Sequence, residues 1–182
     1  MRTKPQDDDH VGFSGWRLLG LGFWQAWWMI SMCTDVLLPT TDRFPFAGNT
    51  TLWVLVLTTV GYLVVVALAR RLSPFLTHRA SFLAAGGLTA AGTVTLPIAL
   101  TLGSGAAGFA WFLAGTVSLS LGNALLLIMW GELWSALATG RVGRHLYVSY
   151  TFAFVLFFVA YALPEAAAVA FTAALPIVLS LI

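Results

Sequence analysis

Six long apolar runs dominate the sequence and leave few folds open to it. They cover roughly residues 16–38, 51–69, 80–102, 105–133, 145–163 and 165–182. A helix needs about 20 apolar residues to cross the ~30 Å hydrocarbon core of a bilayer, and runs of 18 or more are candidates. Only 9% of the residues are charged, against roughly 25% in a soluble domain. We therefore predict an all-α membrane protein, a six-transmembrane-helix bundle.

The chain divides into two parts. Residues 1–15 are polar and charged and are predicted to form a disordered cytoplasmic tail, and residues 16–182 form the six-helix transmembrane domain. The first apolar run exceeds the 7–15 residue core of a signal peptide, and no small-residue cleavage site follows it. We therefore expect this run to remain as the first span.

Basic residues alternate between the polar segments that flank the spans. Arg43 lies between spans one and two, whereas the other eight occupy the alternate segments: Arg2, Lys4, Arg17, Arg70, Arg71, Arg79, Arg141 and Arg144. Lys and Arg collect on the cytoplasmic side of membrane proteins. Both termini are thus predicted to lie on the cytoplasmic side of the cell's inner (plasma) membrane. Since this topology accounts for the positive charge, we expect no nucleic acid to contact this segment.

An internal similarity links spans three and six. AGTVTLPIALTL at 91–102 aligns with AFTAALPIVLSL at 170–181, and Pro97 matches Pro176. Low-complexity apolar segments can match in this way by chance. Alternatively, the pair marks a 3+3 inverted repeat of the kind that builds each six-helix half of major facilitator transporters.

Polar and aromatic side chains share helical stripes on spans one and four. At about 100° per residue, Trp24, Trp28 and Asp35 align on span one, with Ser31 among them and Trp27 beside them; Asn123 and Trp130 align on span four. A buried indole N–H needs a partner, so these stripes are predicted to face the bundle interior. The candidate ligand-binding residues are Trp24, Trp28, Asp35, Asn123 and Trp130, and the ligand is a small molecule with apolar or aromatic surface. Ordinary helix packing is one alternative, and a cytoplasmic aromatic belt is another for Trp130.

Two more spans carry such stripes, which we also expect to face inward. Span two has Thr58 and Tyr62, and span five has Tyr147, Tyr150, Thr151, Phe154, Phe158 and Tyr161. Spans three and four are rich in small residues, among them Gly86, Gly115 and Gly122. Small residues let helix backbones approach closely, so we predict tight packing there.

Catalytic and metal-binding patterns are not evident in the sequence. His10, His78 and His145 lie in different segments without ligand-like spacing, and neither a Ser–His–acid set nor a glycine-rich phosphate loop is present. We expect neither enzymatic activity nor a metal or cofactor. Asp35 and Glu132 lie near the ends of their spans, where water at the interface is an alternative to a functional role.

Six spans, two cytoplasmic termini, the proline-marked repeat and the pair Arg70–Arg71 resemble one half of a major facilitator-type protein. The loop ARRLSPFLTHR departs from the glycine- and aspartate-containing motif of that superfamily. The tryptophan-dense first span, LGNALLLIMWGELWSAL at 121–137 and GRVGRHLYVSY at 140–150 resemble the membrane portion of bacterial regulators with a cytoplasmic LuxR-type helix-turn-helix domain. This second resemblance implies an integral membrane sensor-type domain whose DNA-binding domain lies outside these 182 residues.

Two other functions stay open. One is a half-size major facilitator-like small-molecule transporter acting as a dimer, and the other is an accessory membrane protein without a ligand. The last span ends on VLSLI without a Lys or Arg, so we expect the chain to continue past Ile182. Further spans or a homodimer partner would then cover the polar faces of spans one and four, which would otherwise face lipid.

Overall fold

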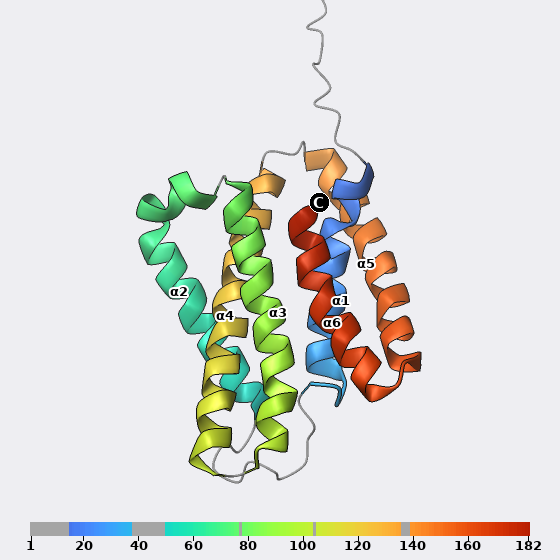
Figure 1. Ribbon diagram of the computed structural model, residues 1–182. Coiled ribbons are helices and arrows are strands. Elements are labelled where there is room, and N and C mark those ends of the chain that lie inside the picture. The colour runs from blue at the N-terminus through green and yellow to red at the C-terminus, as the bar shows by residue number, and fades with distance from the viewer. Residues whose placement is uncertain (1–14, 38–49, 77, 104, 136–138) are drawn as a thin grey trace, which may run out of the picture.

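The computed structural model describes residues 15–37, 50–76, 78–103, 105–135 and 139–182. These residues form α1 (Gly15–Cys33), α2 (Thr50–Leu76), α3 (Arg79–Thr101), α4 (Ala106–Ser135), α5 (Thr139–Ala162) and α6 (Glu165–Leu181). The all-α prediction is confirmed for this part of the chain. Figure 1 shows that α1 begins and α6 ends at the same end of the bundle. The tail predicted at 1–15, apart from Gly15, lies outside the described residues.

The described helices are those of a helical membrane protein. Three of them contain stretches long and apolar enough to cross a bilayer: Arg79–Thr101, Ala106–Glu132 and His145–Ala162. Two shorter apolar helical stretches cover Leu52–Leu68 and Glu165–Leu181. Large apolar side chains on the outer surface are extensively exposed, with Leu63 at 66% and Val66 at 64%. Apolar surface of this extent is rare on soluble monomers and suits contact with lipid.

Three helix boundaries differ by five residues or more from the predicted spans: the end of α1, the end of α2, and the start of α5, which lies at Thr139 and not at 145. α1 ends at Cys33 instead of continuing to residue 38. After Cys33 the Val36 N–H donates to the Thr34 hydroxyl at 3.4 Å, a local turn bond that competes with the helical one. α2 continues to Leu76, beyond the predicted 69, because a helix does not have to stop where its residues cease to be apolar.

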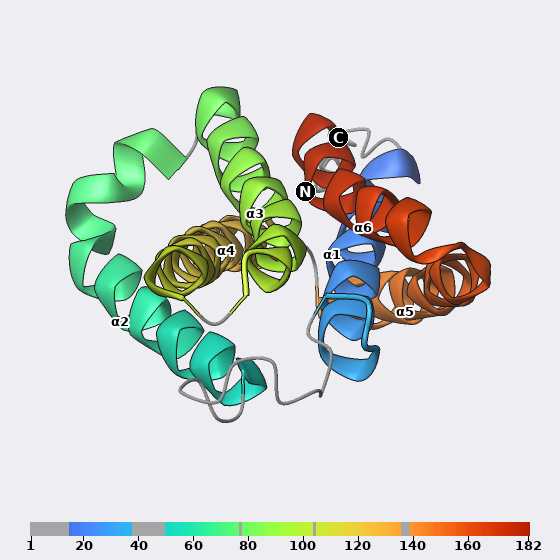
Figure 2. The ribbon, with the colours of Figure 1, turned by 60° about the horizontal axis from the view of Figure 1, so that its bottom comes forward.

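The helices pack as two groups of three. α1 packs against α5 and α6, α4 packs against α2 and α3, and contacts between α3 and α6 join the groups (Figure 2). The α3–α4 contact is tight: a Cβ on Gly92 would lie 2.7 Å from the Gly115 carbonyl oxygen, and one on Gly122 would lie 2.8 Å from the Ala85 carbonyl oxygen. The prediction of close packing through small residues is therefore confirmed. Pro97 and Pro176 lie inside α3 and α6.

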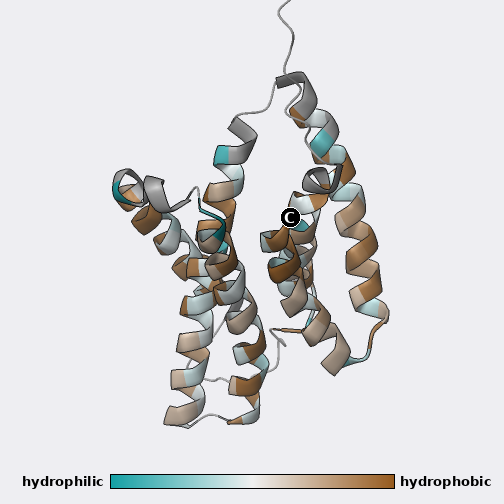
Figure 3. Ribbon diagram, turned by 45° about the horizontal axis from the view of Figure 1, so that its top comes forward, coloured by the Kyte–Doolittle hydropathy of each residue, from teal (hydrophilic) through white to brown (hydrophobic). Residues whose placement is uncertain are grey.

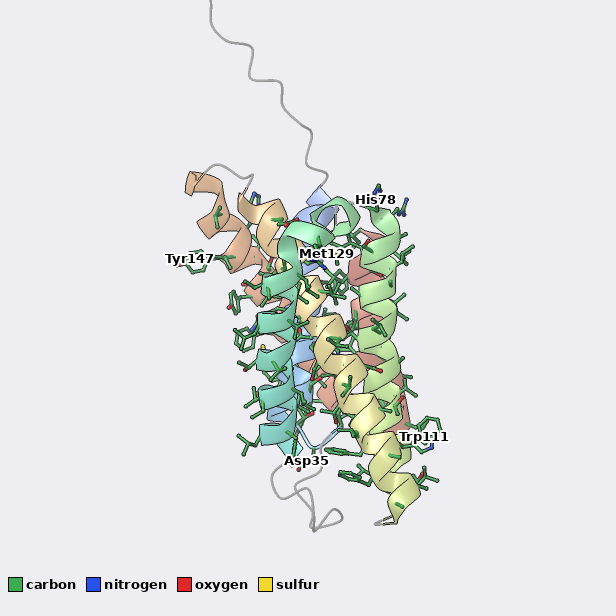
Figure 4. The ribbon with its side chains drawn as sticks, turned by 90° about the vertical axis from the view of Figure 1, so that its left-hand side faces the viewer. Asp35, His78, Trp111, Met129 and Tyr147 are labelled. Atoms are coloured by element: carbon green, nitrogen blue, oxygen red, sulfur yellow. The ribbon has the colours of Figure 1, made fainter. Side chains whose placement is uncertain are left out.

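The prediction for span five is wrong. Its stripe of Tyr147, Tyr150, Thr151, Phe154, Phe158 and Tyr161 is exposed, and Figure 4 shows Tyr147 projecting away from the bundle. α5 instead buries Ser149 and Ala153, and a Cβ on Gly22 of α1 would lie 2.8 Å from the Ser149 carbonyl oxygen. Small side chains set this helix contact because they allow the backbones to approach, so the large aromatic side chains face outward.

The two ends of the bundle differ in charge. Exposed Arg71, His78 and Arg79 lie where α2 ends and α3 begins, at the end where α1 starts; we name this the basic end. Figure 3 shows strongly hydrophilic residues near this end and mostly pale or brown residues along the helices. Asp35 lies at the opposite end, which we name the Asp35 end (Figure 4).

Candidate functional site

Three helices meet at the side chain of Asn123. The Trp24 indole on α1 donates from Nε1 to Asn123 Oδ1 on α4 at 2.7 Å. The Asn123 amide in turn donates from Nδ2 to the Tyr62 hydroxyl on α2 at 3.4 Å. Asn123 is fully buried, and a buried amide needs such partners. The polar stripes predicted on spans one, two and four therefore meet at one point inside the bundle.

Two more tryptophans of α1 extend this contact. Trp28 stacks on Trp24, with ring centroids 6.0 Å apart and ring planes 12° from parallel. Trp27 is fully buried, and its Nε1 donates to the Thr93 hydroxyl of α3 at 3.0 Å. Trp27 was not among the predicted site residues because it lies beside the stripe of Trp24 and Trp28. Its spacing of three residues from Trp24, which places both on neighbouring faces of one helix turn, was the available signal.

Trp130 of α4 packs on the backbone of α1. Its side chain is only 5% exposed, and a Cβ on Gly20 would collide with its ring. Trp24 packs against the same buried cluster. The alternative that Trp130 belongs to an interfacial aromatic belt is therefore wrong. Its Nε1 is buried and has no hydrogen-bond partner among the described residues.

We name these contacts the tryptophan seam, comprising Trp24, Trp27, Trp28 and Trp130 with Asn123 and Thr93. It lies between the group α1, α5, α6 and the group α2, α3, α4. The polar faces of spans one and four thus meet each other inside the bundle; further spans or a homodimer partner stay a prediction. The structure brings four of the five candidate residues together here; ligand binding by them stays a prediction.

Asp35 does not belong to the seam. Because α1 ends at Cys33, the helical stripe that would place Asp35 beneath Trp28 is interrupted, and the residue lies exposed in the following turn. The expectation that it faces the bundle interior with the tryptophans is therefore wrong. Asp35 lines a cavity of about 850 Å³ between α1, α5 and α6, to which none of the seam residues contributes.

This cavity, which we name the Asp35 cavity, combines acidic, hydroxyl and aromatic groups. Residues 31–36 form one wall, and the end of α5 supplies Phe157 and Tyr161. Glu165 and Ala168 come from the start of α6. Sequence reasoning missed Glu165, whose position between two apolar runs was the available signal, and it missed the contribution of Phe157. The carboxylates and aromatic rings that line the cavity suit a ligand that is positively charged and partly apolar.

Comparisons of the chain with protein-family models, with curated proteins and with solved structures find no match. Its function is therefore to be inferred from its own residues and geometry.

Proposed function

We propose that the chain is the integral membrane sensor-type domain of a LuxR-type transcriptional regulator. In this proposal all six helices cross the inner membrane as a 3+3 repeat with both termini in the cytoplasm. A small molecule binds to the domain, and the response passes to a DNA-binding region outside these residues. A half-size facilitator-like transporter acting as a dimer is the second candidate.

The helix contacts support the 3+3 repeat. Exchanging α1, α2 and α3 for α4, α5 and α6 turns the α1–α5 contact into α4–α2 and the α1–α6 contact into α4–α3; all four are present. The α3–α6 contact maps onto itself under the same exchange. A chance resemblance between the segments around Pro97 and Pro176 would not require this correspondence. Inverted repeats of this kind occur in many transporter folds, so the repeat supports the fold and not one function.

The closed seam is the observation that favours a sensor over a transporter whose substrate path runs within one copy of the bundle; in a dimeric half-size transporter the path would run between the two copies. Transporters of repeat architecture bind substrate near the bilayer midplane, between repeats. Near the middle of α1, Trp27 and its partner Thr93 are fully buried, as is Asn123, and indole hydrogen bonds join the two helix groups there. A substrate path along this seam would break both bonds. The Asp35 cavity lies instead at one end of the bundle.

Orientation and assembly follow from the two ends and from α5. The positive-inside rule puts the basic end in the cytoplasm and opens the Asp35 cavity outward. A homodimer partner or further spans would pack on the part of the exposed α5 stripe that does not line the cavity, from Tyr147 to Phe154. Its phenol hydroxyls support this, because a polar group is better satisfied against protein than against lipid.

A comparison of transcription with uptake in the native host tests the proposal. Deleting the gene is expected to change a small set of transcripts and to leave solute uptake by membrane vesicles unchanged. Complementation with Trp27→Phe should restore transcription less well than complementation with Trp53→Phe, since Trp53 is 44% exposed and lies outside the seam. Changed uptake without a transcript response would overturn the sensor in favour of the transporter. No change in either would favour an accessory protein without a ligand.

A further inference from the structure

We propose that the Asp35 cavity binds a small organic cation, an amine or quaternary ammonium compound with an apolar body. This inference rests on the proposed function, because it names the class of ligand that the sensor detects. It moves the ligand site from the tryptophan seam to the end of the bundle.

The charge of the lining selects a cation. Among the described residues that line the cavity, Asp35 and Glu165 are acidic and none is Lys, Arg or His. Helix ends add to this field, because α1 ends at Cys33 and α5 ends at Ala162, both beside the cavity. The carboxyl end of a helix carries partial negative charge. α6 presents its positive amino end, but Glu165 occupies its first turn. Clefts lined by one sign of charge concentrate the opposite ion.

A buried hydroxyl in the cavity wall lacks a partner. Ser31 is 1% exposed, lines the cavity, and its Oγ makes no hydrogen bond within the described residues. Threonine hydroxyls in the helices of this protein form the kind of hydrogen bond that Ser31 lacks: Thr116, for example, donates to the Phe112 carbonyl at 2.7 Å. A buried hydroxyl left unpaired costs free energy. A protonated amine ligand would supply an N–H donor to the Ser31 oxygen, whereas a quaternary ammonium ligand would be held by the carboxylates and the aromatic rings alone.

Aromatic and apolar groups fit the rest of such a ligand. Phe157 and Phe158 meet edge to face, with ring centroids 5.7 Å apart, and Tyr161 lies one turn further along α5; all three line the cavity. Aromatic faces attract ammonium groups, including quaternary ones. Met32, Val36 and Leu163 complete an apolar wall. The volume of about 850 Å³ falls in the range of roughly 300–1,000 Å³ found for small-molecule sites.

The native cysteine allows a direct test. Cys33 is the single cysteine of the chain, and it is exposed and lines the cavity. The full chain in nanodiscs is treated with a cationic thiol reagent, 2-(trimethylammonium)ethyl methanethiosulfonate, or with the anionic 2-sulfonatoethyl analogue. Modification is followed by intact mass, and each rate is divided by the rate with free cysteine. The cationic reagent should then react about tenfold faster, since charged clefts raise local counter-ion concentration by ~10-fold or more.

Two carboxamide variants assign this preference to the cavity. Glu165→Gln and Asp35→Asn should each lower the rate ratio, whereas Glu132→Gln, an exposed carboxylate on the far part of α4, should leave it unchanged. Glu165 is exposed as the first residue of α6, so Glu165→Gln should retain the fold. It therefore stays informative if Asp35→Asn fails to fold. Equal normalised rates, or a ratio insensitive to Glu165→Gln, would overturn the proposal.

Reversible binding is tested by protection. Benzyltrimethylammonium should slow the modification of Cys33 by uncharged methyl methanethiosulfonate, and benzenesulfonate of similar size should not. Ser31→Ala should weaken protection by benzylamine, whose ammonium carries N–H donors, and should leave protection by benzyltrimethylammonium, which has none, unchanged. Equal protection by the two ions would contradict cation selectivity. Nanodiscs expose both faces of the membrane, and the assay requires no transcription. Cation binding can therefore be absent while the sensor proposal holds, and it can be present while the transcription test rules out the sensor.

Discussion

Trp24 Nε1 and Asn123 Oδ1 lie 2.7 Å apart although 99 positions separate the two residues in the chain. The bond joins α1 to α4, two helices that the 3+3 repeat would relate to each other. Neither backbone has to approach the other closely, because the indole spans the space between them. Between α1 and α4 a long side chain therefore makes the contact, whereas α3 and α6 join the two groups through a small residue, since a Cβ on Gly86 would lie 2.6 Å from the Pro176 carbonyl oxygen.

A double-mutant cycle measures this bond. Trp24→Phe and Asn123→Leu should each destabilise the protein in nanodiscs, and their coupling should be about 0.6–1.7 kcal/mol, the span from average to largest coupling for hydrogen bonds between membrane helices. Unfolding is followed by steric trapping. Pairing Asn123→Leu with Trp53→Phe on the outer face of α2 provides the control. A coupling no larger than in this control pair would show that the bond contributes nothing to stability.

A pair of glycines on α3 tests the small-residue contact. Gly92→Ala should destabilise the bundle by about 1–3 kcal/mol, as overpacking does, since the added Cβ meets the α4 backbone at Leu119 and Gly115. Gly87→Ala is the matched control, because a Cβ there meets nothing within 4 Å. Because alanine favours a helix over glycine, Gly87→Ala should keep or slightly raise the thermal midpoint. Equal thermal midpoints for the two variants would refute the tight α3–α4 contact.

Trp27 and Trp130, the two most buried tryptophans among the described side chains, should respond differently to replacement by phenylalanine. Trp27→Phe removes the bond to Thr93, whereas Trp130→Phe removes an indole N–H that has no partner among the described residues. An unpaired buried donor is itself costly, by about 1–3 kcal/mol. Trp27→Phe should therefore destabilise the protein by about 1 kcal/mol or more relative to Trp130→Phe. The reverse order in denaturant midpoints would contradict this assignment of partners.

How far the sequence predicts this structure depends on which force sets each feature. The apolar runs predicted the helices, and the stripe of Trp24 and Trp28 indicated the buried face of α1, because both depend on periodicity within one helix. The exposed stripe of α5 was not predictable in this way: contacts of Ser149 and Ala153 with another helix orient it. The prediction for Asp35 was wrong because α1 ends at Cys33 and a local turn with a Val36 N–H to Thr34 bond follows, whereas a helical projection assumes that the helix continues.

Membrane orientation is tested with single cysteines. An impermeant maleimide should label native Cys33 in spheroplasts, because the Asp35 end is predicted to face outward. His78→Cys in a Cys33→Ser background should react only after the membrane is permeabilised, since His78 is exposed at the basic end. Labelling of His78→Cys alone in intact spheroplasts would reverse the orientation.

The proline inside α6 bears on how the two ends of the bundle are connected. Pro176 has no N–H, which removes the usual partner of the Thr172 carbonyl, and a helix bends most easily where such a bond is missing. Before this point α6 carries Glu165 and Ala168, which line the Asp35 cavity. After it, the Leu181 carbonyl accepts a bond from Arg79 at 3.5 Å. A bend of α6 at Pro176 would therefore move the helix segment that lines the Asp35 cavity relative to the segment that contacts Arg79 at the basic end of α3.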